Sequence, residues 1–149
     1  MFAYYEGELK DFIEDALVSK GTLLKRVLFK ASERLIDDLK SKGVIIDKSY
    51  CHTIDNSAVQ HAIKNHSSPY EKLRGQIPIS NQDLLLVPDI LSGYETIATE
   101  KNRRGQDVII YTKTMEDGVR IYVEEIRIGR HELAASTIYK RKRMTHRRK

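Results

Sequence analysis

The sequence predicts an α+β fold, in which N-terminal helices pack on a four-stranded antiparallel β-sheet. Apolar residues in the first part of the chain recur with a period near 3.6, which is typical of amphipathic helices. From residue 96 onward the chain instead consists of short β-branched and aromatic segments separated by turn signals. Strands joined by short turns pair antiparallel, and helices that precede such a sheet indicate the α+β class. At 149 residues the chain is most simply one domain.

Two helices are expected at the start of the chain. Residues 8–19 place their apolar side chains on one helical face. Thr22 is a good N-cap for a second helix over residues 23–42, and Gly43 follows as a C-terminal stop. Residues 1–43 are therefore predicted to form a helical N-terminal segment that packs on the rest of the protein.

The middle of the chain alternates between strand and helix signals. Residues 44–54 are β-branched and predict one or two strands. Asp55-Asn56-Ser57 then supplies cap residues for a helix over 58–66, which Ser67-Ser68-Pro69 ends.

A short helix is predicted after a loop that runs through residues 72–76. Ile77-Pro78-Ile79 is extended, because proline disfavours helix in the residue before it. Ser80 and Asp83 have the spacing of a capping box, which starts a helix over 81–92 that restarts at Pro88.

The last third predicts an antiparallel meander of four strands. Its turns are Asn102–Gly105, Met115–Gly118 and Gly129, and the second contains a strong Asp-Gly hairpin signal. Glu124-Glu125 breaks the alternation of the third strand and predicts a bulge or edge exposure there. The four strands are expected over residues 96–100, 107–113, 119–128 and 131–141.

Positive charge is concentrated at the C-terminus. Residues 140–149 hold seven of the 26 Lys and Arg residues and no acid, which leaves 19 basic against 21 acidic residues in the remainder. A basic tail over residues 142–149 can bind polyanions through counterion release, and it can equally be a solvated end.

Other features exclude several classes of protein. The single cysteine, Cys51, permits no intramolecular disulfide and fits a reducing, cytoplasmic location. Since no apolar run approaches the ~20 residues of a membrane span, no membrane partner is expected. His61 and His66 lie about 140° apart round a helix, so they do not face one metal, and neither a metal nor a cofactor is predicted.

Candidate site residues come from the third helix and the last two strands. His61 is a candidate general acid or base, with a surface histidine as the alternative. Arg127 can bind phosphate bidentately, or it can pair with a glutamate on a neighbouring strand. Thr137 and Tyr139 share one face of the last strand, and Lys140 points to the other.

Short motifs also follow one another in a distinctive order. A helix with Val59-Gln60-His61-Ala62-Ile63-Lys64-Asn65-His66 leads to Gly75-Gln76-Ile77-Pro78-Ile79-Ser80 and Val87-Pro88-Asp89-Ile90. Then come Tyr111, Tyr122-Val123-Glu124-Glu125-Ile126-Arg127, and Leu133-Ala134 through Ser136-Thr137-Ile138-Tyr139-Lys140. In this order, residues 50–141 resemble the phage-associated branch of the nuclease group that joins barnase, EndoU, tRNA-cleaving colicins and RelE-type toxins. That branch occurs in phage head-morphogenesis proteins and in polyvalent proteins of mobile elements.

The resemblance implies a nuclease-like α+β domain over residues 44–141 and metal-independent RNA cleavage, in which the 2′-hydroxyl attacks the adjacent phosphate. It implies an RNA substrate, with tRNA as one candidate, a toxin or phage-borne effector, and a cognate inhibitor protein. The residues that it places in the site are His61 as acid or base, Thr137 and Tyr139 on the phosphate, Arg127 and Lys140 as charge stabilisers, and Arg130 and His66 as RNA-binding side chains.

Two other functions fit the same sequence. A non-catalytic module of this fold would bind nucleic acid through the basic tail. A phage-assembly interaction domain would instead use the surface of residues 23–42.

Overall fold

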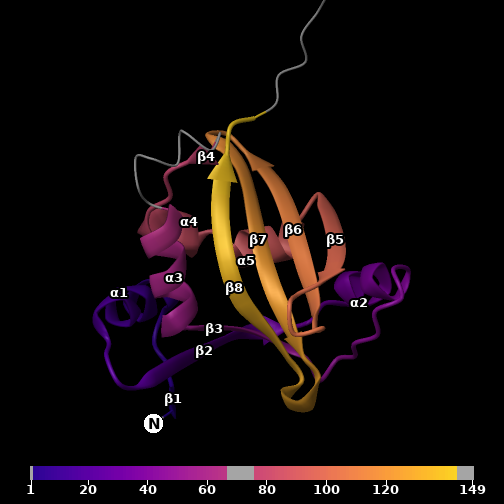
Figure 1. The fold of residues 1–149 in the computed structure, drawn as a ribbon, viewed down its shortest axis with the longest axis horizontal. Coiled ribbons are helices and arrows are strands. Elements are labelled where there is room, and N and C mark those ends of the chain that lie inside the picture. Colours follow the sequence, from indigo (N-terminus) through magenta and orange to yellow (C-terminus); the bar gives the residue numbers. More distant parts are fainter. Residues whose placement is uncertain (1, 67–75, 144–149) are drawn as a thin grey trace, which may run out of the picture.

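The protein forms one mixed β-sheet with five helices around it in the residues that the computed structural model describes, 2–66 and 76–143. Seven strands lie in the order β1-β2-β3-β8-β7-β6-β5, and β4 pairs with β8 (Figure 1). The strands are β1 Phe2–Tyr4, β2 Leu23–Lys30, β3 Cys51–Asp55, β4 Gln76–Ile77, β5 Thr96–Lys101, β6 Asp107–Met115, β7 Gly118–Arg127 and β8 Glu132–Arg141.

The α+β class is confirmed, but the expectation of a sheet with only four antiparallel strands is wrong. The predicted meander exists as β5–β8, with every neighbouring pair antiparallel. The sheet then continues, because β3 pairs in parallel with β8 and β2 pairs antiparallel with β3. The strands β2 and β3 are distant from the meander in the sequence, so no local turn signal predicts that they extend its sheet.

The helices are α1 Leu9–Val18, α2 Glu33–Lys40, α3 Asn56–His66, α4 Asn81–Leu85 and α5 Val87–Gly93. They confirm the predictions for residues 8–19, 58–66 and 81–92. The predicted capping box is also present, since the Ser80 amide donates to the Asp83 carboxylate (2.8 Å) and the Ser80 hydroxyl accepts in return. The predicted helix stop over 67–69, most of the loop through 72–76 and the tail from 144 onward lie outside the described residues.

The prediction of one helix over residues 23–42 is wrong, because this stretch forms β2 followed by α2. The apolar spacing of Leu23, Leu24, Val27 and Leu28 suits a helical face, but these residues lie on a strand that is only partly buried, with Val27 40% exposed. Ser32 then caps α2 by accepting a hydrogen bond from the amide of Leu35 (3.1 Å). Pairing with β1 and β3 therefore overrides the helical periodicity. Likewise, within the predicted 44–54 segment only residues 51–54 are strand, as part of β3.

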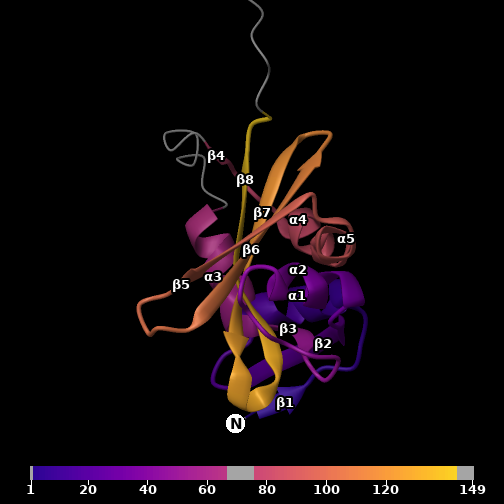
Figure 2. The same cartoon turned by 90° about the vertical axis from the view of Figure 1, so that its right-hand side faces the viewer.

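The two faces of the meander have different surroundings. α4 and α5 pack on one face, towards the right in Figure 2, and α3 runs beside β8. No helix of the described part of the chain covers the face of β5–β8 that is turned to the viewer in Figure 1.

Glu124 explains the broken pattern of β7. Its carboxylate is fully buried, accepts a hydrogen bond from the Tyr111 hydroxyl (2.6 Å) and lies 2.7 Å from Nδ1 of His52. Burial raises the pKa of Tyr111, which keeps this phenol protonated as a donor. The predicted bulge is confirmed, since the β7–β8 register shifts between Val123 and Glu124.

Candidate active site

An open pocket of about 230 Å³ lies where the start of α3 meets strands β7 and β8. Most of the side chains that line it are charged or polar, and they come from four separate parts of the chain. Its lining consists of Asp55, Ser57, Ala58, His61, Arg104, Glu125, Arg127, Ala135 and Ser136.

The position of α3 is fixed at its first turn. Asp55, the last residue of β3, accepts a hydrogen bond from the amide of Ala58 (2.8 Å) and so starts the helix. The Asn56 side chain bonds the backbone of β2 and the preceding loop, at Leu24 (3.1 Å) and Thr22 (2.8 Å). His61 is exposed on the next turn, and its Nδ1 lies 3.0 Å from the side-chain nitrogen of Asn65.

Glu125 is the most constrained acid of the pocket. One carboxylate oxygen lies 2.9 Å from Nη2 of Arg104 and 3.2 Å from the side-chain nitrogen of Asn102. The other lies 3.0 Å from Nε of Arg127. Glu125 and Arg127 are two apart on β7 and therefore share a face.

The two arginines differ in how firmly they are held. The Arg127 side chain is 30% exposed, and its Nη1 lies 3.8 Å from the carboxylate of Glu132. The Arg104 side chain is 74% exposed and extends from the turn between β5 and β6. Each guanidinium thus contacts Glu125 and still has surface open to a ligand.

This arrangement can perform acid–base chemistry on a phosphate group. A carboxylate accepts a proton, and a histidine near neutral pH can donate one. Guanidinium groups bind phosphate oxygens and stabilise the negative charge that develops on them. Within the described ranges, no group of three or more His, Cys, Asp or Glu side chains is arranged to hold a metal ion.

The structure brings some of the predicted residues together. His61 and Arg127 both line the pocket, beside Ser136 of β8. Thr137 and Tyr139 follow on β8 but are not lining residues. The hydroxyl of Thr137 is buried without a hydrogen-bond partner, and the Tyr139 ring lies 5.6 Å from the ring of His66.

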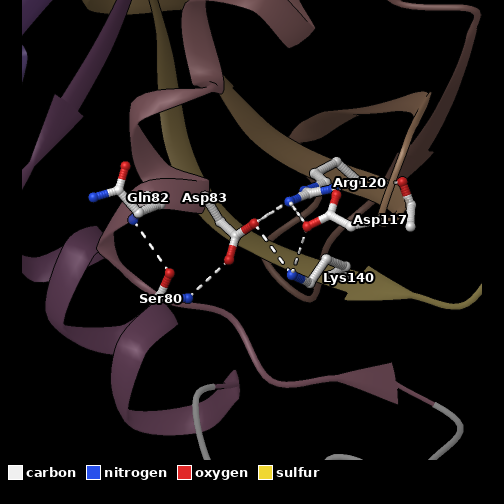
Figure 3. Close-up of polar contacts among 7 residues, drawn as sticks. Ser80, Gln82, Asp83, Asp117, Arg120 and Lys140 are labelled. Atoms are coloured by element: carbon white, nitrogen blue, oxygen red, sulfur yellow. Dashed lines mark hydrogen bonds and ion pairs between the residues drawn. The ribbon is translucent and has the colours of Figure 1, made fainter.

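Two predicted cations lie elsewhere. Arg130 is exposed in the turn Ile128–Arg130 that precedes β8. Lys140 is largely buried and belongs to another cluster, shown in Figure 3, with its Nζ 3.5 Å from both Asp83 and Asp117. The structure therefore does not bring Lys140 to the pocket of His61.

The buried cluster around Lys140 joins α4 to strands β7 and β8. Asp83 bonds Nε of Arg120 (3.0 Å) and also caps α4 through the amide of Ser80. Arg120 further contacts Asp117 in the β6–β7 turn (Figure 3). With Arg120 and Asp83 only 3% and 4% exposed, these charges satisfy one another inside the protein.

Sequence reasoning missed Glu125 and Arg104. Adjacent strand residues point to opposite faces, and the structure agrees, since Glu124 lies in the core and Glu125 in the pocket. The overlooked signal was Glu125-Ile126-Arg127, which places an acid and a base on one face. Arg104 had no comparable local signal, because only the folded hairpin carries it to β7.

Comparison with known protein families gives a match over most of the chain. The family model described as phage-Barnase-EndoU-ColicinE5/D-RelE like nuclease 3 matches residues 29–147. Searches of the curated proteins and of the solved structures find no match. No helix among the described residues is long and apolar enough to cross a membrane.

Proposed function

Because the chain belongs to the phage-Barnase-EndoU-ColicinE5/D-RelE like nuclease 3 family, we propose that its nuclease domain is an endoribonuclease whose active site is the pocket between α3 and β7. In the proposed reaction, the 2′-hydroxyl of RNA attacks the adjacent phosphate. The products are a 2′,3′-cyclic phosphate and a new 5′-hydroxyl. The reaction needs a proton acceptor, a proton donor and cations at the phosphate, and it requires no metal ion.

The observation that carries the proposal is Glu125, which lies between two guanidinium groups in the same pocket as His61. Glu125 accepts the proton of the attacking 2′-hydroxyl. His61 donates a proton to the 5′-oxygen that leaves. A bound phosphate replaces part of the contact between Glu125 and the arginines, which frees carboxylate lone pairs for the 2′-hydroxyl.

Arg104 and Arg127 bind the phosphate oxygens, where charge increases as the phosphorus gains a fifth oxygen. Their exposed surfaces make them available to a ligand from the uncovered face of the sheet. Ser136 is the hydroxyl-bearing residue of β8 that lines this pocket. Tyr139 and the neighbouring His66 of α3 contact the RNA farther along β8, whereas the Thr137 hydroxyl is buried and makes no contact with it. Lys140 has no role in the reaction because it is paired with Asp83 and Asp117.

The test is to incubate the protein with total cellular RNA and with tRNA in excess EDTA, and to analyse the ends of the fragments. We expect fragments that end in 2′,3′-cyclic phosphate. Glu125→Gln and His61→Ala should each reduce the rate about 10²–10⁴-fold, the usual contribution of a general base or acid. Arg103→Ala removes a charge from the turn that carries Arg104 and serves as the matched control, with an unchanged rate. Absence of cleavage across these RNAs, or equal rates for the wild type and His61→Ala, would refute the proposal.

The basic C-terminus supports a second candidate, a non-catalytic nucleic-acid-binding module. Deletion of residues 142–149 distinguishes the two functions. A binding module would lose RNA affinity and most of its salt dependence, whereas the nuclease would keep its cleavage rate on short substrates. If the protein is a nuclease, we further propose that it acts as an effector of a phage or mobile element. A cognate inhibitor protein would then restrain its activity.

A further inference from the structure

The proposed active-site pocket is the first of three open pockets that adjoin one another along one surface. The second, of about 490 Å³, shares Arg104, Glu125 and Arg127 with the first and extends to the turn between β7 and β8. The third, of about 390 Å³, shares Arg130 with the second and reaches β1. We call the second and third pockets together the extended groove.

Positive charge dominates the extended groove once its acids are paired. Glu125 is engaged by Arg104 and Arg127. Glu132 is buried and lies 2.6 Å from the ammonium of Lys25, which is itself only 2% exposed. Arg130 is the exposed cation shared by both pockets, so it offers a binding site for a phosphate beyond the one that is cleaved.

Exposed apolar side chains lie next to this cation. Ile128 is 67% exposed in the second pocket, and Tyr4 is 61% exposed at the end of the third. Aromatic rings beside a positively charged groove are the usual platform on which single-stranded nucleic acids stack their bases. Tyr4 lies on β1, outside the residues 29–147 that the family model matches.

We propose that the extended groove binds single-stranded RNA that continues from the cleaved phosphate past Arg130 to a base stacked on Tyr4. This inference rests on the proposed function for the position of the cleaved phosphate. The substrate is then a single-stranded polymer of several nucleotides, since a duplex has no free base to stack on a side chain. The N-terminal strand adds this contact to the nuclease domain.

The binding experiment separates the groove from catalysis by using RNA that cannot be cleaved. Fully 2′-O-methylated oligonucleotides of two, four and six nucleotides lack the attacking hydroxyl, and a 2′-O-methylated hairpin stem supplies the duplex. Fluorescence anisotropy at several salt concentrations gives each dissociation constant. We expect affinity to increase from the dimer to the hexamer, and the stem to bind more weakly than the hexamer.

Two variants test the contacts, and two further variants are controls. Arg130→Ala should weaken binding of the hexamer about tenfold, reduce its salt dependence by about one phosphate contact and leave the dimer unaffected. Tyr4→Leu should weaken binding of the hexamer by a factor of five or more, whereas Tyr4→Phe keeps the ring and should bind normally. Arg103→Ala removes the same charge from a neighbouring turn and should change no affinity.

Equal losses of dimer and hexamer binding on Arg130→Ala would refute the proposal that the extended groove binds RNA. Equal binding by Tyr4→Leu and Tyr4→Phe would refute it as well. Because both side chains are exposed, the variants should fold, and circular dichroism checks that they do. Length-dependent binding without cleavage of unmodified RNA would instead refute the nuclease proposal and support RNA binding in the extended groove. Cleavage with a KM that is independent of substrate length would refute the groove alone.

Discussion

Two clusters of charged side chains share strand β7 and differ mainly in their exposure. The buried cluster consists of Asp83, Asp117, Arg120 and Lys140 (Figure 3), and the pocket cluster consists of His61, Arg104, Glu125 and Arg127. Strand β7 supplies Arg120 to the first and Glu125 with Arg127 to the second. The Arg120 side chain is 3% exposed, whereas those of Arg127 and Arg104 are 30% and 74% exposed.

The comparison shows that a charged residue on a strand is not identified as functional by its type. The Arg120 guanidinium is occupied by Asp83 and Asp117 and has almost no surface left for a ligand. Arg127 and Arg104 each contact Glu125 and keep a solvent-facing edge. We therefore expect the buried cluster to determine stability and the pocket cluster to determine activity, and each prediction below tests that separation.

The largest effect is expected for Asp83→Ala. The change leaves the Arg120 guanidinium buried with its inner partner removed and also deletes the capping box of α4, so the free energy of unfolding should fall by roughly 3–5 kcal/mol. Urea denaturation measures it, with Asp107→Ala as the control. The pair of Asp107 with Lys101 is partly solvated and should contribute less than about 1 kcal/mol. A loss below about 1 kcal/mol for Asp83→Ala would show that the buried cluster does not hold α4 on the sheet.

Arg127→Ala should have the opposite effect, with a large loss of cleavage rate and a small loss of stability. Cleavage of RNA should fall about 10²–10³-fold, which corresponds to roughly 2.7–4 kcal/mol of transition-state stabilisation. The free energy of unfolding should change by less than about 1 kcal/mol, because the side chain is part-exposed and Glu125 retains Arg104. Single-turnover kinetics and urea denaturation of the same preparation measure both quantities. Parallel losses of rate and stability would mean that Arg127 is a structural residue like Arg120.

Lys140→Met sharpens the comparison, because the sequence marks Lys140 as a catalytic cation. Its ammonium lies 3.5 Å from each of two carboxylates that Arg120 also contacts, so removing it should cost about 1–2 kcal/mol of stability. The cleavage rate of the folded protein should stay within about threefold of the wild type. A rate that falls a hundredfold or more while the protein remains folded would show that Lys140 takes part in catalysis.

Local signals explain which parts of the fold could be predicted. The β6–β7 hairpin follows from Asp117-Gly118, where φ of Gly118 is +149° and a Cβ would lie 2.8 Å from the carbonyl oxygen of Arg141. Helices α3 and α4 follow from their cap residues, Asp55 and Ser80. β2 could not be predicted, because its apolar spacing suits a helix and its partners β1 and β3 are remote in sequence.

The candidate site shows the same limit. His61 and Arg127 were identified from chemistry and segment order, and they do line one pocket. In the sequence, Glu124-Glu125 indicates only a break in the strand pattern, and nothing local distinguishes the pocket carboxylate of Glu125 from the buried one of Glu124. The position of Arg104 beside Glu125 depends on the conformation of the β5–β6 turn, which no residue spacing in the sequence predicts.

The smallest effect is expected at the solvent-facing edge of the buried cluster. A hydrogen bond from Arg120, reinforced by the charges of Arg120 and Lys140, lowers the pKa of Asp117 from 3.8 to about 2. A lowered pKa stabilises the folded state above pH 3.8, and this contribution disappears as the pH falls towards 2. A shift of this size corresponds to at most about 2 kcal/mol, but the Asp117 side chain is 63% exposed, so solvent screening should leave less than about 1 kcal/mol. Urea midpoints of the wild type and Asp117→Asn should therefore differ slightly at pH 5 and converge between pH 3.8 and 2. A difference that persists at pH 2 would show that Asp117 acts through packing and not through its charge.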